Sequence, residues 1–192
     1  MTAPVVVGIS GASGAIYGIE ILRMLRELDI PSHLIVTELG ARTITIETDL
    51  SLDEVRALAT QSHNNKDLAA SVASGSFITS GMIVAPCSIK TLPGVANSFS
   101  MNLLVRAADV MLKQARPLVL MVRETPLHKG HLRLMVEAAD SGAHIMPPVP
   151  AFYNRPAEIS DLVRHTAGRA LDLIGIDHNL CDRWQGDPVS TD

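Results

Sequence analysis

Short apolar runs alternate with helical patterns along most of this chain. Residues 4–9 form a run rich in valine that ends in the glycine-containing turn 10–14, and residues 15–28 follow with apolar side chains at helical spacing. A strand, a glycine turn and a helix in this order are typical of the start of a nucleotide-binding α/β domain.

The same alternation continues toward the C-terminus. Further apolar runs predict strands at 33–37, 82–85, 117–122 and 144–146. Helical patterns between them predict helices at 52–59, 100–116, 130–139 and 159–174. Ser51, with Glu54 three residues on, predicts a capping box at the first of these helices, whereas the polar stretch 61–66 predicts an exposed loop.

Strands that alternate with helices predict a three-layer α/β fold, with a mostly parallel sheet covered on both faces. We find no repeat, linker or second domain, so we predict one domain over 1–186 and a short polar tail at 187–192. Ligands of such sheets bind beyond the carboxyl ends of the strands. We therefore expect a site at the loops that follow Ile9, Val36, Ala85 and Val122.

Composition narrows the class of protein. The chain has 192 residues, of which 47% are hydrophobic and 19% charged, which suits one folded domain and argues against disorder. The net charge of −4 argues against nucleic-acid binding. No apolar run approaches the roughly 18 residues of a membrane helix, and residues 1–4 lack a basic signal-peptide region. Two distant cysteines, Cys87 and Cys181, fit a reducing cytosol, so we expect a cytoplasmic protein.

The loop 11–14 (Gly-Ala-Ser-Gly) precedes the first predicted helix. Free N–H groups at a helix N-terminus suit a phosphate, and Ser13 adds a hydroxyl. The match to G-x-G-x-x-G is poor, however, and a simple tight turn is the alternative. After the strand 82–85, Ser88 and Thr91 would either cap the next helix or cradle a second anion or a flavin, and Cys87 would be a small buried residue.

Arg123 and Glu124 directly follow the apolar run 117–122. Charges at the mouth of a buried strand lose hydration, which favours a ligand-binding or acid/base role over a local ion pair. In the helix at 100–116, Arg106 and Lys113 are seven residues apart and share a face. An ordinary Asp109–Lys113 surface pair is the alternative there.

Three further residues and the histidines give weaker evidence for a functional site. Tyr153 and Arg169 are unremarkable singly, and Trp184, the only tryptophan, would either anchor the tail or stack on a ligand. None of the seven histidines has zinc-site spacing, so we expect no metal.

Six blocks of sequence, in order between Val5 and Gly186, resemble the UbiX-type flavin prenyltransferases. The blocks around Arg106, Glu124 and Tyr153 are together highly specific, and the chain is most similar to the branch that includes the B subunit of hydroxyarylic acid decarboxylases. The six blocks are 11–15, 81–88, 102–110, 122–127, 147–153 and 183–184.

This resemblance implies a flavodoxin/Rossmann-like flavoprotein domain and a homo-oligomer, commonly a dodecamer, whose active sites are shared between subunits. Members join a dimethylallyl group from dimethylallyl phosphate to N5 and C6 of reduced FMN, without a metal. The product, prenylated FMN, is the cofactor of a UbiD-type decarboxylase that acts on aromatic or unsaturated acids. The sequence does not distinguish dimethylallyl phosphate from the pyrophosphate as donor.

The resemblance also implies roles for individual residues. Ser13 and Glu124 would handle protons, and Trp184 would line the prenyl pocket. The prenyl phosphate would be held by Arg106, Lys113, Tyr153 and Arg169. FMN would be held by Gly11, Ala12, Ser13, Thr37, Ser88, Thr91 and Arg123. The stretch 98–101 departs from the family pattern, so substrate preference could differ there.

Two alternatives remain open at this point. Flavin-dependent cysteine decarboxylases share the fold type and the glycine loop, but they carry a P-x-M-N-x-x-M-W block, whereas Met101-Asn102 here continues as Leu103-Leu104-Val105. A non-catalytic flavin-carrier subunit of a decarboxylase is the other alternative. The presence of Arg106, Lys113 and Glu124 argues against a mere carrier.

Overall fold

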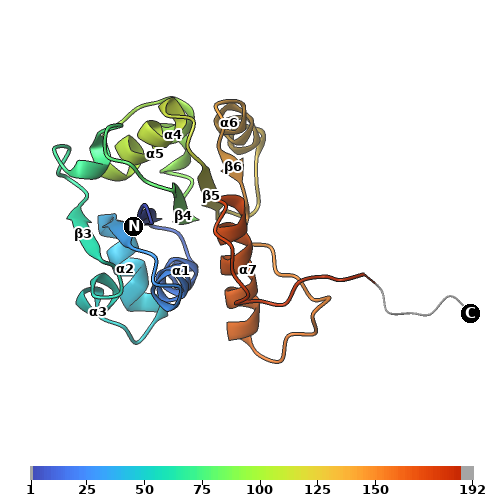
Figure 1. Cartoon of the computed structure of the whole chain (residues 1–192). Helices are drawn as coiled ribbons and strands as arrows, with labels where there is room; N and C mark the ends of the chain where they lie inside the picture. The colour runs from blue at the N-terminus through green and yellow to red at the C-terminus, as the bar shows by residue number, and fades with distance from the viewer. Residues whose placement is uncertain (1, 187–192) are drawn as a thin grey trace, which may run out of the picture.

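Six parallel strands form the centre of the molecule, and the computed structural model describes residues 2–186 (Figure 1). The strand order is β3-β2-β1-β4-β5-β6, which is the 3-2-1-4-5-6 order of a Rossmann-like doubly wound sheet. The strands are β1 (Val5–Ile9), β2 (Ser32–Val36), β3 (Gln61–Asn64), β4 (Gly81–Cys87), β5 (Leu118–Val122) and β6 (His144–Ile145).

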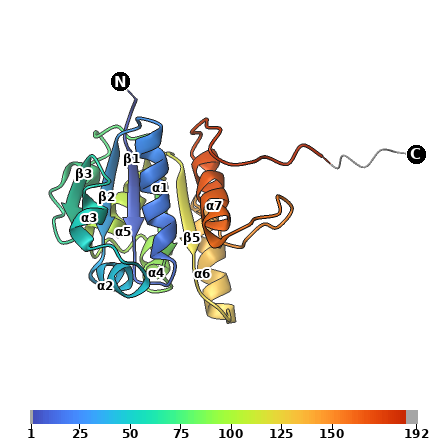
Figure 2. The same cartoon turned by 90° about the horizontal axis from the view of Figure 1, so that it is seen from below.

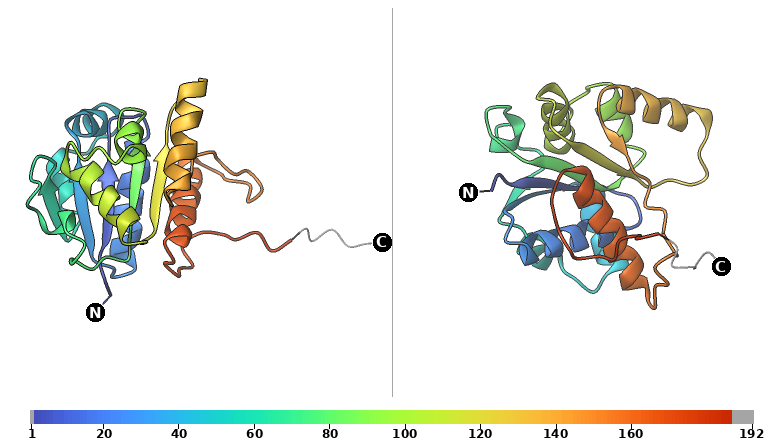
Figure 3. Two further views of the ribbon diagram at one scale, coloured as in Figure 1. Left: turned by 90° about the horizontal axis from the view of Figure 1, so that it is seen from above. Right: turned by 45° about the vertical axis from the view of Figure 1, so that its right-hand side comes forward.

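Two layers of helices cover the sheet (Figures 2 and 3). The helices are α1 (Ala15–Glu27), α2 (Glu38–Glu47), α3 (Leu52–Arg56), α4 (Leu92–Ala96), α5 (Leu103–Lys113), α6 (Lys129–Asp140) and α7 (Ile159–Leu173), with a 3₁₀ turn at Ser71–Ala73. Side chains alternate across the strands: Val5 and Val7 of β1 pack in one core with α1 and α7, whereas Val6 packs in the other with α4, α5 and α6. The predicted single three-layer α/β fold with a parallel sheet is confirmed.

The strand order reverses between β1 and β4, so the loops after these two strands lie side by side. Hydrogen bonds through one buried hydroxyl join them. Ser10 Oγ donates to the Pro86 carbonyl over 2.8 Å and accepts from the Ser88 N–H over 2.7 Å. This topological switch point is where open α/β sheets bind ligands.

The predicted elements are present within a few residues of their expected bounds, with two exceptions. The predicted loop at 61–66 is wrong, because residues 61–64 form the edge strand β3 through backbone pairing with β2, which requires no apolar side chains. The sequence pattern also does not predict α2, since its β-branched run 43–46 favours a strand and Ile46 is exposed.

Several smaller predictions are also tested by the structure. The Ser51–Glu54 capping box is present. Helix α5 begins only at Leu103, because the Asn102 side chain accepts from the Val105 N–H and caps it there. Cys87 is fully buried, and burial raises the pKa of its thiol to about 12. The predicted tail at 187–192 lies outside the described residues. No helix of the described chain has both the length and the apolar character that a membrane crossing requires.

Candidate functional site

Four of the residues expected to bind FMN line a cavity at the switch point. Gly11, Thr37, Ser88 and Thr91 border this hollow of about 180 Å³ at the carboxyl edge of the sheet. A larger hollow of about 770 Å³ adjoins it and shares Thr37 as a lining residue. The loop after β1 is in close contact with the start of α2, because a Cβ on Gly11 would clash with the Leu39 Cβ. Only glycine fits at this position.

Ser88 and Thr91 point their hydroxyls toward each other. The two oxygens are 3.0 Å apart, and the Ser88 Oγ also accepts from the Thr91 N–H over 3.2 Å. Both residues are less than a tenth exposed. The Ser88 hydroxyl therefore caps only the turn 88–91. The expected cap on the next helix is absent, because Thr91, the N-cap residue of α4, makes no side-chain capping bond there. Both hydroxyls remain able to bond to a flavin or phosphate oxygen in the adjoining cavity.

The N-terminus of α1 is occupied by a carboxylate of the same chain. The Glu47 Oε2 accepts from the Gly14 N–H over 2.8 Å and from the Ala15 N–H over 3.1 Å. The prediction that these N–H groups are free for a phosphate is therefore wrong, and Ser13, one residue earlier, is exposed beside them. Glu47 was missed because it ends the unpredicted helix α2, far along the chain.

Arg123 and Glu124 lie at the carboxyl end of β5, as expected. The Arg123 N–H donates to the Cys87 carbonyl over 3.0 Å. This bond holds the start of the loop after β5 against the end of β4. Burial raises the pKa of Tyr17 on α1, and the positive charge of Arg123 opposes this, so the guanidinium lies near that helix.

The local ion-pair alternative for these two charges is not observed in the described chain. Glu124 is half-buried and its Oε1 accepts only from the adjacent Thr125 N–H, over 3.0 Å. Neither Arg123 nor Glu124 forms an ion pair with another residue of the described part. Both charges are available to a ligand, which favours the ligand-binding or acid/base interpretation.

On α5, Asp109 pairs with Arg106 and not with Lys113. Arg106 Nη1 donates to Asp109 Oδ2 over 2.7 Å, and Arg106 Nε donates to the Ala73 carbonyl. The alternative Asp109–Lys113 pair is therefore wrong. Lys113 is exposed at the last turn of the helix, roughly 10 Å along the axis from Arg106 at 1.5 Å per residue.

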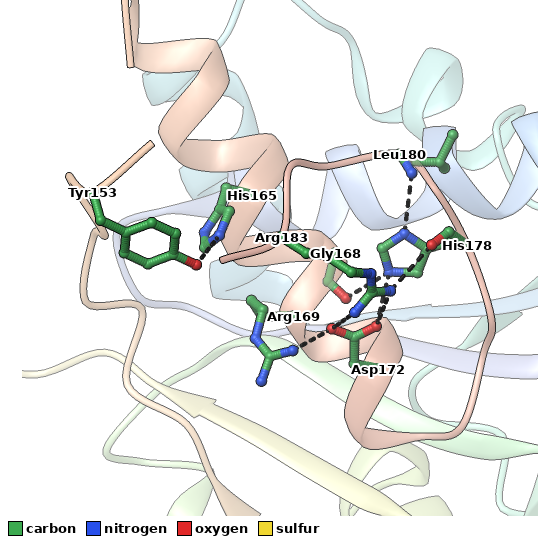
Figure 4. Close-up of polar contacts among 8 residues, drawn as sticks. All are labelled: Tyr153, His165, Gly168, Arg169, Asp172, His178, Leu180 and Arg183. Atoms are coloured by element: carbon green, nitrogen blue, oxygen red, sulfur yellow. Dashed lines mark hydrogen bonds and ion pairs between the residues drawn. The ribbon is translucent and has the colours of Figure 1, made fainter. Parts of the chain in front are cut away.

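Figure 4 shows Tyr153 and Arg169 beside α7, and Trp184 joins them through its contact with the Tyr153 ring. The Tyr153 and Trp184 rings meet edge to face, with centroids 5.5 Å apart. The Tyr153 hydroxyl is 2.9 Å from the Nε2 of His165, a buried residue. Burial, helped by the charge of Arg169, lowers the pKa of His165, so the ring is neutral near pH 7.

Asp172 joins this cluster. Its carboxylate accepts from Arg169 one turn earlier and from Arg183, the neighbour of Trp184. Burial raises the pKa of Asp172, but Arg183 and Arg169 together lower it further, so the group remains ionised. The sequence gives one weak signal for Asp172 and His165, which is that each lies three or four residues from Arg169 on the same helix.

The residues expected to hold the prenyl phosphate do not meet within one chain. Arg106 and Lys113 are on α5, whereas Tyr153 and Arg169 lie at α7, and these two helices cover opposite faces of the sheet (Figure 3). Residues 2–186 also contain no group of three His, Cys, Asp or Glu side chains that could hold a metal ion. A prenyl-phosphate site with all four residues therefore requires a second copy of the chain.

Comparison with known proteins gives consistent matches. A family model described as Flavoprotein matches residues 2–168. The chain is 56% identical over 184 residues to the flavin prenyltransferase UbiX of Escherichia coli (strain K12), covering 94% of this chain and 97% of that protein.

Two solved structures are similar over almost their whole length. One is the crystal structure of AnUbiX (PadA1) in complex with FMN and dimethylallyl pyrophosphate, with a TM-score of 0.95 and 48% identity, covering 97% of this chain and 99% of that chain. The other is a dodecameric FMN-dependent Ubix-like decarboxylase from Escherichia coli O157:H7, with a TM-score of 0.92 and 46% identity, covering 95% and 100%.

Proposed function

Because the chain belongs to the Flavoprotein family, and within it to the UbiX-type flavin prenyltransferases, we propose that it joins a dimethylallyl group from dimethylallyl phosphate to N5 and C6 of reduced FMN. The observation that carries this proposal is the 56% identity with a flavin prenyltransferase over 94% of the chain. The hydroxyl-lined cavity at the switch point supports it independently, because a flavin in this fold binds at that position.

The carboxyl edge of the sheet holds FMN in this proposal. Thr37, Ser88 and Thr91 supply hydroxyls to the cavity, and Arg123 supplies a positive charge at the end of β5. Gly11 and Ala12 allow close approach of the backbone, and Ser13 presents a hydroxyl at the same edge. Reduced FMN supplies the nucleophilic N5 when it is bound there.

The cationic residues stabilise the leaving group. The donor's C–O bond breaks with its electron pair on the phosphate, so negative charge gathers on the phosphate oxygens. Arg106, Lys113 and Arg169 are donors of the required sign. The Tyr153 hydroxyl adds a neutral hydrogen bond, and we assign the exposed Trp184 ring beside it to the contact with the prenyl chain.

Ring closure breaks the C6–H bond, and this proton needs an acceptor, while the prenyl double bond takes up a proton as its other carbon bonds to C6. Glu124 is half-buried and free of ion pairs among the described residues, and a positioned carboxylate can relay a proton in this way. Ser13, in the loop after β1, takes part in the same proton transfers. These two residues are the ones that we assign to proton handling.

The active protein is a homo-oligomer, and we infer a dodecamer with shared sites. Two segments project from the body of the domain, the loop 147–158 and the arm after α7 (Figure 2). They expose apolar side chains, including Val149, Phe152 and Trp184, at 59–74% of their surface. Exposed apolar groups of this kind mark contacts with another protein. A partner copy would bring Arg106 and Lys113 to Tyr153 and Arg169.

The product serves a UbiD-type decarboxylase in the cytoplasm. Both cysteines are free thiols in the structure, as a reducing compartment requires. The near full-length identity with a prenyltransferase favours this role over the cysteine decarboxylase and flavin-carrier alternatives.

Reconstitution tests this role. A UbiD-type decarboxylase apoenzyme, made without any prenyltransferase, receives this protein with reduced FMN and either dimethylallyl phosphate or the pyrophosphate, followed by air. We expect activation only in a complete mixture, and the donor that activates faster is the preferred one. Activation by FMN alone, or no activation although prenylated flavin has formed, would count against the maturation role.

A further inference from the structure

The C-terminal arm is held to α7 by a polar network that the proposed reaction does not yet explain (Figure 4). Its centre is the Asp172 carboxylate, in the last turn of α7, whose side chain is only 16% exposed. Carboxylates this deeply placed are normally paired, and this one has two arginine partners that lie on different segments.

The first partner is Arg169. Its Nη1 donates to Asp172 Oδ2 across one helical turn, while its side chain as a whole remains 51% exposed. Figure 4 shows the guanidinium between Asp172 and Tyr153, with its second terminal nitrogen directed away from the carboxylate. A charge-assisted bond on one side therefore fixes the guanidinium and leaves donors on its other side for a phosphate.

The second partner is Arg183, in the arm. Its two terminal nitrogens donate to the two carboxylate oxygens over 2.8 and 3.2 Å, and Nη2 also donates to the His178 carbonyl over 3.1 Å. This bidentate geometry restricts the arm in orientation as well as distance. Trp184 is the next residue, so the pair determines where the indole meets the Tyr153 ring.

The arm packs closely against α7 at Gly168. The buried His178 ring is 2.9 Å from the Gly168 carbonyl and 3.3 Å from Asp172 Oδ1. A Cβ on Gly168 would lie 2.6 Å from the Cys181 Sγ. Any larger residue at 168 would push the arm outward, so the close packing at this point is specific.

We propose that Asp172 is a positioning residue of the prenyl-donor site, which orients Arg169 directly and Trp184 through Arg183. The Asp172 carboxylate then fixes two parts of that site: the Arg169 guanidinium, which binds the phosphate, and the Trp184 ring, which contacts the prenyl chain. The inference rests on the proposed function for the identity of the donor, whereas the arrangement of Trp184 can be tested without any turnover.

Two measurements on the intact protein test this proposal. Asp172→Asn removes the charge but keeps the size of the side chain. Because charged hydrogen bonds are lost at both arginines, we expect the Kd for dimethylallyl phosphate to rise roughly tenfold or more, with the Kd for FMN unchanged. Trp184 is the only tryptophan, so fluorescence excited at a wavelength that tyrosine does not absorb reports on it alone. We expect lower anisotropy in the variant.

Three further variants separate positioning from general structure. Asp172→Glu keeps the charge and should recover part of the donor affinity. Arg183→Gln should lower the Trp184 anisotropy while Arg169 stays paired, and it serves as the test if Asp172→Asn does not fold. Asp53→Asn breaks an exposed Asp–Arg pair, with Arg56, on helix α3 and should change neither the donor Kd nor the Trp184 anisotropy.

Unchanged Trp184 anisotropy and donor affinity in a folded Asp172→Asn protein would overturn the proposal. Loss of FMN affinity to the same degree as donor affinity would also overturn it, because the effect would then be structural. Failure of the proposed function would give a different result, because the unmodified protein would then form no prenylated flavin. The comparison of Trp184 anisotropy would still show whether Asp172 positions the arm.

Discussion

At the scale of single residues, Arg123 and Glu124 are neighbours with different surroundings. Arg123 is exposed near Tyr17, whereas Glu124 is half-buried and bonded only to the next backbone N–H. A carboxylate with no cationic partner in the described chain keeps its lone pairs for a reacting group. Its surroundings therefore suit proton transfer better than structural support.

We predict that Glu124→Gln slows prenyl transfer or ring closure while FMN binding stays the same. Loss of a general acid or base typically costs on the order of 10²–10⁴-fold in rate. Single-turnover rates and FMN titration measure the two effects separately. Glu137→Gln, which removes the partner of Arg133 on α6, is the control. A Glu124→Gln protein with normal rates would exclude this residue from the mechanism.

The sequence identifies residues at strand ends more readily than residues that act through contacts. Thr37, Ser88 and Arg123 follow apolar runs, so parallel-sheet topology alone places them at the site edge. Glu47 and Asp172 give no such signal. Their partners, Gly14 and Arg183, are distant in sequence or lie outside any predicted element, and only the folded chain shows the contact.

At the scale of elements, the edge strand β3 is held to β2 by a histidine pair as well as by backbone bonds. His33 Nδ1 and His63 Nε2 are 2.9 Å apart, and the His33 ring lies against Phe77. Burial lowers the pKa of both rings. For His33 the neighbouring His63 adds to this effect, and for His63 the charge of Asp67 opposes it.

We predict that this pair makes the fold less stable in mild acid. A histidine whose folded pKa is lowered contributes stability above its unfolded pKa of about 6.5 and loses it as the pH falls through the folded value. The Tm should therefore drop between pH 7.5 and 5, and drop less in His63→Gln. Each 1 kcal/mol corresponds to roughly 2–4 °C for a chain of this size.

The exposed His144 supplies the control for this experiment. His144→Gln should keep the pH dependence of the unmodified protein, since the side chain lies in solvent. Equal slopes of Tm against pH for His63→Gln and the unmodified protein would show that the pair does not contribute.

The two errors at this scale have one physical cause. Strand β3 and helix α2 are determined by backbone pairing and capping, not by an apolar face. Residues 61–64 are polar yet hydrogen-bond to β2. Thr37 caps α2 by accepting from the Gly40 N–H, although the run 43–46 has strand-like propensity. Periodicity of apolar residues predicts the other elements well because they do bury such a face.

At the scale of the whole molecule, one chain presents parts of a site on opposite sides. Helix α5 carries Arg106 and Lys113 on one face of the sheet, and α7 carries Arg169 on the other. Sequence blocks can indicate that all of these residues matter. They cannot show which of them meet within a chain, since that depends on how copies of the fold assemble.

We predict that inactive chains complement each other. Arg106→Ala, on α5, and Arg169→Ala, on α7, should each lose donor affinity in their own oligomers. Mixed oligomers should regain part of the activity, because some shared sites then receive neither defect. Separately purified oligomers, combined without subunit exchange, are the control. Recovery absent from mixtures of proven hybrid composition would mean that each site lies within one chain.

The most direct test of the account is mass spectrometry of the flavin after incubation of this protein with reduced FMN and dimethylallyl phosphate or pyrophosphate. We predict a new flavin species heavier by one prenyl-derived unit, formed only when protein, reduced FMN and a donor are all present. FMN recovered unchanged with both donors, from a protein that binds FMN, would contradict the assignment as a flavin prenyltransferase.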